Sequence, residues 1–212
     1  MGNFHYVIAG LPDLILDFEK SGFNFNSLLD NIMETLSPKN KRVVEFLLFG
    51  LKEENLNNHF YRVSSASSNK FIREYFKTDL LIRNIQSAYI ARKNSMDPDQ
   101  FIIGRGEIQE NLKSSKAPDF GLTQISDTSA TVIKILETEN ILDREQQIDM
   151  IRWKLADEIC TFNYFDINII LLFILKASIV ERWSRLDKKR GLEIFEKFVY
   201  EVKGSFKLDN NN

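Results

Sequence analysis

The chain has 212 residues and a formal net charge of −2, with 43% hydrophobic and 27% charged residues. These values are typical of one folded domain with a sizeable core, and they argue against wholesale disorder and against a basic, nucleic-acid-binding domain. Its single cysteine, Cys160, excludes an intrachain disulfide. With no stretch that reads as a secretory signal, we expect Cys160 to be a small core residue of a protein that folds in a reducing cytoplasm.

The N-terminal third predicts one well-defined helix. Residues 4–16 open with a short apolar run that suits a helix or a strand equally. Ser37 followed by Pro38 is a typical helix start, and the apolar residues after it predict a helix that ends near Gly50. The polar stretch 55–69 contains a serine cluster and is expected to be a loop.

A second helix is predicted over about 71–93, because large apolar residues recur there at helical spacing. The following segment, 94–126, is punctuated by proline and glycine, so we expect loops around a short helix near 107–112. Such long loops inside a compact domain tend to be functional or mobile. Helices are expected again over about 127–139 and after Asp143, which begins a sequence typical of a capping box.

The stretch from Phe162 to Trp183 is the one around which we expect the chain to be organised. No charge occurs between Asp166 and Lys176, which predicts a helix over about 166–187 that is capped by Asp166 and buried on all sides. The apolar run is too short to cross a bilayer. Three β-branched residues near its start leave a buried strand as the alternative, although the unbroken length favours a helix.

These patterns predict an all-α fold with at least about half of the residues helical, which circular dichroism would test. We expect a single domain over 1–205, with lobes 1–93 and 127–205 joined by the loop-rich segment 94–126. A final amphipathic helix should follow Gly191, and residues 206–212 should form a disordered tail. Ile170, Phe173 and Ile174 should be buried, with Phe173→Ala costing about 3–5 kcal/mol of stability.

An internal similarity suggests two copies of one long-helix unit. Placing Phe76 over Phe165 aligns Asp79 with Asn168 and brings several apolar positions into register. The alternative is that two buried helices share apolar spacing by chance.

Motifs for catalysis are scarce. Asp119-Phe120-Gly121 matches the metal-binding tripeptide of protein kinases, but the phosphate loop, strand lysine and catalytic aspartate of that chemistry do not accompany it. His5 and His59 have no metal-ligand spacing to other ligands. We therefore expect no catalytic residue, metal or cofactor. The arginines Arg83, Arg92, Arg182 and Arg185 either pair with surface acids or form an edge that faces a protein partner.

Two segments resemble the C-subunit family of V-type and A-type ATPases, whose eukaryotic counterpart is the d-subunit of the proton pump. Tyr75 to Arg92 resembles a helix of that family in which an acidic residue precedes an Asn-containing stretch ending in Arg. Phe165 to Arg185 resembles a later helix of the same kind. The whole chain also resembles a shorter, uncharacterised bacterial family associated with V-type ATPases, through 9–13, 119–122 and the block from Trp153 to Trp183.

The resemblance implies a truncated form of that family's helical bundle, because its members have three related helical units and this chain shows at most two. It implies a non-catalytic central-stalk subunit that links the rotor shaft to the membrane ring and transmits torque. Its partners would be the rotor and ring subunits, and it would lie in the cytoplasm at the inner face of the membrane without binding nucleic acid. The alternative is a helical adaptor unrelated to the ATPase.

Partner contacts are expected first in the loop-rich segment, where Arg105 and Phe120 are the candidate residues, and next at the end of the central helix, at Arg182 and Arg185. Arg83 and Arg92 complete the candidate set. Deleting 104–121 is expected to abolish assembly with the ATPase while leaving the helical melt nearly intact.

Overall fold

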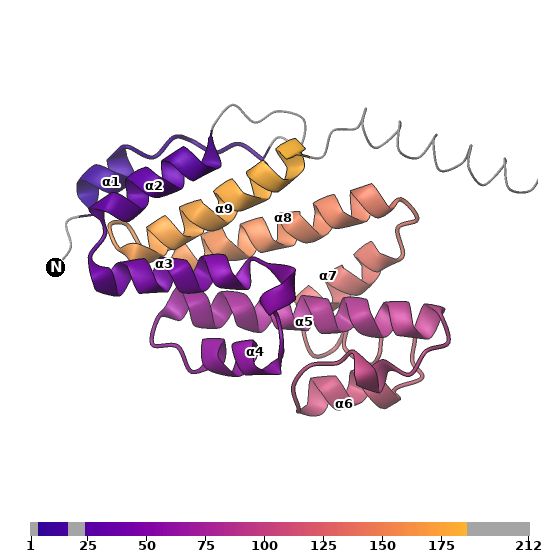
Figure 1. Ribbon diagram of the computed structural model, residues 1–212. Helices are drawn as coiled ribbons and strands as arrows, with labels where there is room; N and C mark the ends of the chain where they lie inside the picture. Colours follow the sequence, from indigo (N-terminus) through magenta and orange to yellow (C-terminus); the bar gives the residue numbers. More distant parts are fainter. Residues whose placement is uncertain (1–3, 17–23, 186–212) are drawn as a thin grey trace, which may run out of the picture.

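The computed structural model describes residues 4–16 and 24–185 (Figure 1). Within these ranges 71% of the residues are helical and no strand occurs, which confirms the all-α prediction. The α-helices are α1 (His5–Ala9), α2 (Phe25–Thr35), α3 (Pro38–Gly50), α4 (Asn58–Ser65), α5 (Lys70–Lys93), α6 (Glu107–Ser114), α7 (Asp127–Leu136), α8 (Ile141–Cys160) and α9 (Ile167–Arg185). Short 3-10 helices occupy Glu53–Asn55 (η1) and Pro98–Gln100 (η2). The predicted final helix and tail lie outside the described residues.

The helix starts follow local capping chemistry. Ser37 caps α3 by accepting a hydrogen bond from the Asn40 amide, as the Ser-Pro pair predicts. Asp166 accepts one from the Asn168 amide at 2.8 Å at the start of α9. The predicted start at Asp143 is wrong, because Asn140 caps α8 through the Leu142 amide and places Asp143 inside the first turn.

The prediction of a loop over 55–69 is also wrong, because α4 lies within it. Asn57 caps this helix, and Phe60, Tyr61 and Ser64 form its buried face. The Ser64 hydroxyl donates to the Tyr61 carbonyl, so this serine is accommodated inside the helix. The serines and asparagines of this stretch therefore belong to the helix and its cap rather than to a break in regular structure.

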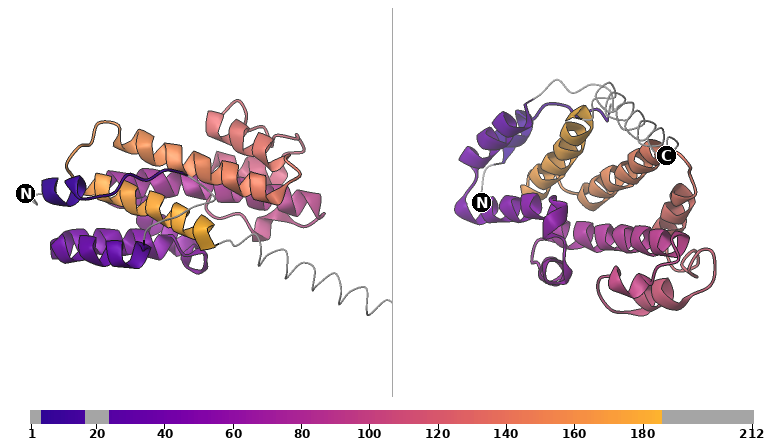
Figure 2. Two further views of the ribbon diagram at one scale, coloured as in Figure 1. Left: turned by 90° about the horizontal axis from the view of Figure 1, so that it is seen from above. Right: turned by 45° about the vertical axis from the view of Figure 1, so that its right-hand side comes forward.

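Helix α5 lies at the centre of the arrangement. Helices α8 and α9 run side by side along one flank of it, with α4 and α6 on the other, and α7 covers its far end (Figures 1 and 2). A first hydrophobic cluster combines the beginning of α5 with α2, α3, α4 and α9, and a second combines its end with α6, α7 and the loops around them. Both clusters draw on residues before 94 and after 126. Division into two lobes stays a prediction.

Helix α9 is largely buried, although Ile169, Leu172 and Lys176 form a half-buried stripe along one side of it. No residue from Asp166 to Glu181 is exposed, and Ile170, Phe173 and Ile174 have exposed fractions of 0%, 6% and 1%. The prediction of a helix in this stretch is thus confirmed over the strand alternative. In the described part of the chain, no helix combines the length and apolarity that crossing a membrane requires.

The segment 94–126 is packed into the protein rather than lying over it. It contains the predicted short helix, α6, and its side chains Ile102, Leu112, Phe120 and Leu122 belong to the second hydrophobic cluster. Deleting 104–121 would remove two of these residues, Leu112 and Phe120, from the core. The expectation that such a deletion spares the helical melt is therefore wrong.

Gly50, the last residue of α3, permits a close approach of three helices. An added Cβ would lie 2.3 Å from Cζ of Phe60 and 2.4 Å from Cζ of Phe76, and both rings are buried and packed edge to face. Gly50→Ala should therefore destabilise the protein by about 1–3 kcal/mol, although alanine has the higher helix propensity. Urea unfolding measures the change. Gly10→Ala, where the new Cβ meets no atom closer than 3.4 Å, is the control and should change stability little. A stabilised Gly50→Ala would contradict this account.

Candidate functional site

A buried carboxylate on α5 forms the centre of the most unusual polar cluster in the structure. Asp79 is 2% exposed, and its Oδ2 accepts hydrogen bonds from Nε of Arg83 at 2.9 Å and from the Tyr61 hydroxyl at 3.0 Å. Its Oδ1 accepts from Nε of Arg152, on α8, at 3.1 Å. Burial raises the pKa of Asp79, but Arg152 and Arg83 outweigh it and hold that pKa below its ordinary value.

Arg152 joins Asp79 to a second buried carboxylate, Asp149. The two residues are three apart on α8, so they face the same neighbours, and Nη1 of Arg152 donates to Oδ1 of Asp149 at 3.1 Å. Oδ2 of Asp149 accepts from Nε1 of Trp183, on α9, at 2.7 Å, and from Nη2 of Arg182. Burial lowers the pKa of Arg152, yet Asp79 and its other neighbours raise it above the usual value. We call Asp79, Arg83, Asp149, Arg152 and Arg182 the charge network.

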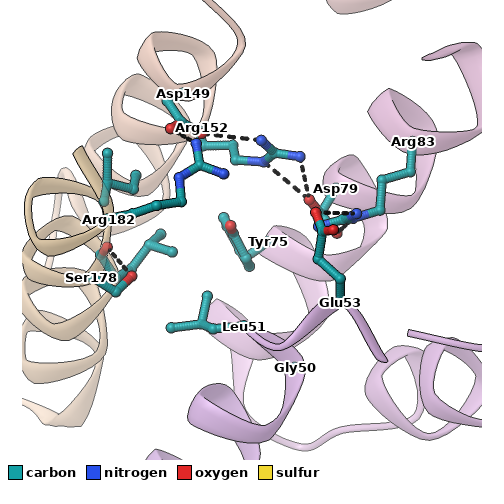
Figure 3. A pocket seen from close by; sticks show the side chains of 12 residues that line it. Gly50, Leu51, Glu53, Tyr75, Asp79, Arg83, Asp149, Arg152, Ser178 and Arg182 are labelled. Carbon is teal, nitrogen blue, oxygen red and sulfur yellow. Dashed lines mark hydrogen bonds and ion pairs between the residues drawn. The ribbon is translucent and has the colours of Figure 1, made fainter. Parts of the chain in front are cut away.

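The charge network lines a pocket of about 240 Å³ between α3, α5, α8 and α9, with Arg182 on one side of it and Arg83 on the other (Figure 3). Leu51, Leu175 and Ile179 supply apolar lining, and Tyr75 points into the space from α5. Glu53 stands at the rim, where its 77% exposed side chain pairs with Arg83 at 3.4 Å. Asp79, Asp149 and Arg152 are thus the buried charges of the pocket, whereas Arg83 and Arg182 are partly exposed.

The structure brings two of the predicted partner-binding arginines, Arg83 and Arg182, into the charge network and leaves the others apart. Arg185 is exposed and pairs with Glu181 one turn earlier. Arg105 is exposed in the turn between Gly104 and Gly106, both of which have positive φ.

Arg92 and Phe120 contact each other, apart from the charge network. The guanidinium of Arg92 donates to the carbonyls of Ser115 at 2.8 Å and Ala117 at 2.7 Å, and its Cζ lies 3.6 Å from the centroid of the Phe120 ring. Phe120 is 1% exposed, so it is a core residue here. This contact fastens the loop-rich segment to the end of α5.

Sequence reasoning missed Asp79, Asp149 and Arg152 as a group. A signal was present, since each interrupts the apolar face of a predicted helix, and charged residues are seldom fully buried unless they are paired. The sequence pattern does not show which charged residues pair, because Asp79 and Arg152 are 73 residues apart in the chain.

The chemistry of the charge network favours binding and stability over catalysis. Both buried carboxylates are occupied by guanidinium groups, and a low pKa leaves Asp79 a poor proton donor. Burial raises the pKa of Cys160 to about 12, so its thiol is unreactive at neutral pH and fills the core as expected. In residues 4–16 and 24–185, no three His, Cys, Asp or Glu side chains gather as a metal site would require.

A second feature is the loop between α8 and α9, which exposes three aromatic side chains. Phe162, Tyr164 and Phe165 are 89%, 69% and 52% exposed. We call these three residues the aromatic loop. The His5 ring of α1 lies 3.9 Å from the Phe165 ring, so the N-terminal helix flanks this surface. Exposed aromatic side chains gathered at one place are typical of protein contact sites.

Comparison with known proteins places most of the chain in a family. Residues 50–205 match the model of a family described as "Protein of unknown function (DUF2764)". The match includes α4 to α9, and therefore every residue of the charge network and the aromatic loop. No curated protein and no solved structure matches the chain.

Proposed function

The chain belongs to the DUF2764 family. We propose that this member is a non-catalytic coupling subunit of a V-type rotary ATPase that links the rotor shaft to the membrane ring. The proposal rests on the resemblance of two segments to the C-subunit family and on the way in which the structure uses those segments.

The observation that carries the proposal is that the two resembling segments are joined by the charge network. They correspond to α5 and α9, and Arg152 and Asp149 of α8 connect the carboxylate of Asp79 on α5 to Arg182 and Trp183 on α9. Charged hydrogen bonds in a buried site are directional, so they fix the relative positions of three helices. Stiffness between long helices is the property that a torque-transmitting part requires.

Two exposed surfaces at opposite ends of α9 would serve two different partners. The aromatic loop precedes the first residue of this helix, and Arg182 and Arg185 lie in its last turn. With a rise of 1.5 Å per residue, a helix of 19 residues separates its ends by about 27 Å. One surface is aromatic and the other cationic, so the two would select chemically different contacts.

The direct test is co-purification of the tagged protein from its own membranes, which should recover rotor or ring proteins of the ATPase. The second candidate function is a helical adaptor unrelated to the ATPase, which the exposed aromatic loop supports equally well. Recovery of a different, reproducible set of partner proteins would favour the adaptor and contradict the coupling role.

Removing the aromatic loop's side chains should separate binding from folding. The double substitution Phe162→Ala and Tyr164→Ala is expected to reduce the recovered partner at least about 10-fold, since exposed aromatics dominate the energy of many interfaces. The melting temperature should be unchanged, because neither side chain is buried. Ile141→Ala with Leu142→Ala, an exposed apolar pair at the start of α8, is the matched control. Equal recovery for both double variants would show that the aromatic loop is not an interface.

A further inference from the structure

Tyr75 is a buried residue whose hydroxyl faces the pocket of the charge network. The residue is 3% exposed, and its ring packs on Phe71 and Phe76. Its hydroxyl points into the pocket (Figure 3), and no side chain or carbonyl of the described residues forms a hydrogen bond with it. Tyr61, close by, shows the usual arrangement, since its hydroxyl donates to Asp79. A tyrosine whose ring is buried and whose hydroxyl opens onto a pocket without a protein partner can donate to a ligand there.

Arg182 supplies further donors to the same space. It forms a hydrogen bond with Asp149 through Nη2, whereas a guanidinium carries five N–H groups. Its side chain is 46% exposed and lines the pocket on the side of α9, across from Glu53 (Figure 3). Burial lowers the pKa of Arg182, although the nearby carboxylates of Glu145 and Glu53 act to raise it.

The charged lining of the pocket restricts the kind of ligand. Three arginines line it together with Asp79, Asp149 and Glu53, so these side chains are formally balanced. A ligand with a single negative charge adds the least charge to this lining, whereas a phosphate dianion would add two. The apolar lining from Leu51, Leu175 and Ile179 suits a ligand with methylene groups.

We propose that this pocket binds a single carboxylate on a short aliphatic stem, which accepts hydrogen bonds from the Tyr75 hydroxyl and the Arg182 guanidinium. The carboxylate can come from the acidic side chain of a partner protein or from a small carboxylic acid. This inference is independent of the proposed coupling role, because it depends only on the pocket's own residues.

Thermal unfolding of the full chain at pH 7 tests the proposal with sodium acetate, inorganic phosphate or sodium chloride at equal ionic strength. Acetate should raise the melting temperature above that in chloride, because a ligand that binds only the folded state stabilises it. Tyr75→Phe should weaken the apparent acetate affinity about 10-fold, since a hydrogen bond to a charged group is lost. Without acetate, this variant should melt at or above the wild-type temperature, because the hydroxyl has no internal partner.

Tyr89→Phe, on the same helix but in contact with the second hydrophobic cluster, is the control and should keep the wild-type response. Arg182→Gln should lose the acetate response as Tyr75→Phe does. Acetate that stabilises no better than chloride, equal responses of wild type and Tyr75→Phe, or a stronger Tyr75-dependent response to phosphate would each overturn the proposal.

A capped glutamate, blocked at its backbone amine and carboxyl groups, distinguishes the two sources of the carboxylate. Binding at least about 10-fold tighter than acetate indicates a protein side chain, because the longer stem and the backbone amides add contacts. Binding no tighter than acetate indicates a small carboxylic acid. Either result supports the carboxylate site itself.

Discussion

Replacing Arg152 with methionine should destabilise the protein by about 3–5 kcal/mol, because removal of one member of a buried ion pair leaves the other charge uncompensated. Arg152 is 8% exposed and is the link between two carboxylates that are themselves almost fully buried. Methionine keeps much of the volume and the aliphatic stem of arginine, so the change tests charge and hydrogen bonding rather than packing. Urea unfolding at pH 7 measures the change in the free energy of unfolding.

Arg185→Met is the matched control for that substitution. Arg185 pairs with Glu181 across one turn of α9, but its side chain is 69% exposed, and such surface pairs contribute about 0–1 kcal/mol. A loss of similar size in both variants would show that the burial of the charge network has no energetic consequence.

The free energy of unfolding should also depend on pH differently in wild type and in Arg152→Met. The pKa of Asp79 is lowered in the folded protein, so its ionised form contributes stability above the unfolded pKa of about 4, and this contribution is lost as the pH falls through the folded pKa. Arg152 is the largest source of that lowering. The stability difference between wild type and Arg152→Met should therefore narrow below about pH 4. An undiminished difference at pH 3 would contradict the assignment.

The second large effect is expected at Phe173, in the middle of α9. Phe173→Ala should cost about 3–5 kcal/mol, since the ring is 6% exposed within the first hydrophobic cluster and its loss would leave a cavity. The melting temperature in differential scanning calorimetry measures the effect. Phe162→Ala removes the same group eleven positions earlier, where it is 89% exposed, and should change stability by less than about 0.5 kcal/mol. Equal melting of the two variants would mean that α9 is misplaced.

Periodicity and breakers predict the long helices well because both are local properties. The regular apolar spacing in α5 and the uncharged run in α9 each predict a helix that is covered on several sides. Helix α4 could not be predicted in this way because its buried face consists of only three residues among serines and asparagines. Its stability comes from packing on α5, which no local pattern records.

The candidate site could be predicted only in part, for the same reason. Arg83, midway along α5, and Arg182, in the last turn of α9, were identifiable as cations on apolar helices. Their joint position depends on how α5, α8 and α9 cross. The loop-rich segment shows the converse. Glycine and proline correctly marked its turns, yet they carry no information on the burial of Leu112 and Phe120.

The internal similarity of the two long helices has a similar limit. Asp79 and Asn168, which the similarity aligns, have different surroundings in the structure. Asp79 binds two arginines, whereas the Asn168 side chain accepts a hydrogen bond from Asn69 at 2.9 Å. Equivalent positions in two helices can thus acquire unrelated roles, and the repeat stays a prediction.

Helix α5 contributes to both hydrophobic clusters, with Phe71 and Phe76 in the first and Ile82 and Ile85 in the second. Neither cluster can open without exposing apolar residues of this one helix, so the two should unfold as a single cooperative unit. In hydrogen exchange, the amides near the middle of α5 should then report the global free energy of unfolding. The amides of α1, which has no buried residue, should exchange through local opening long before.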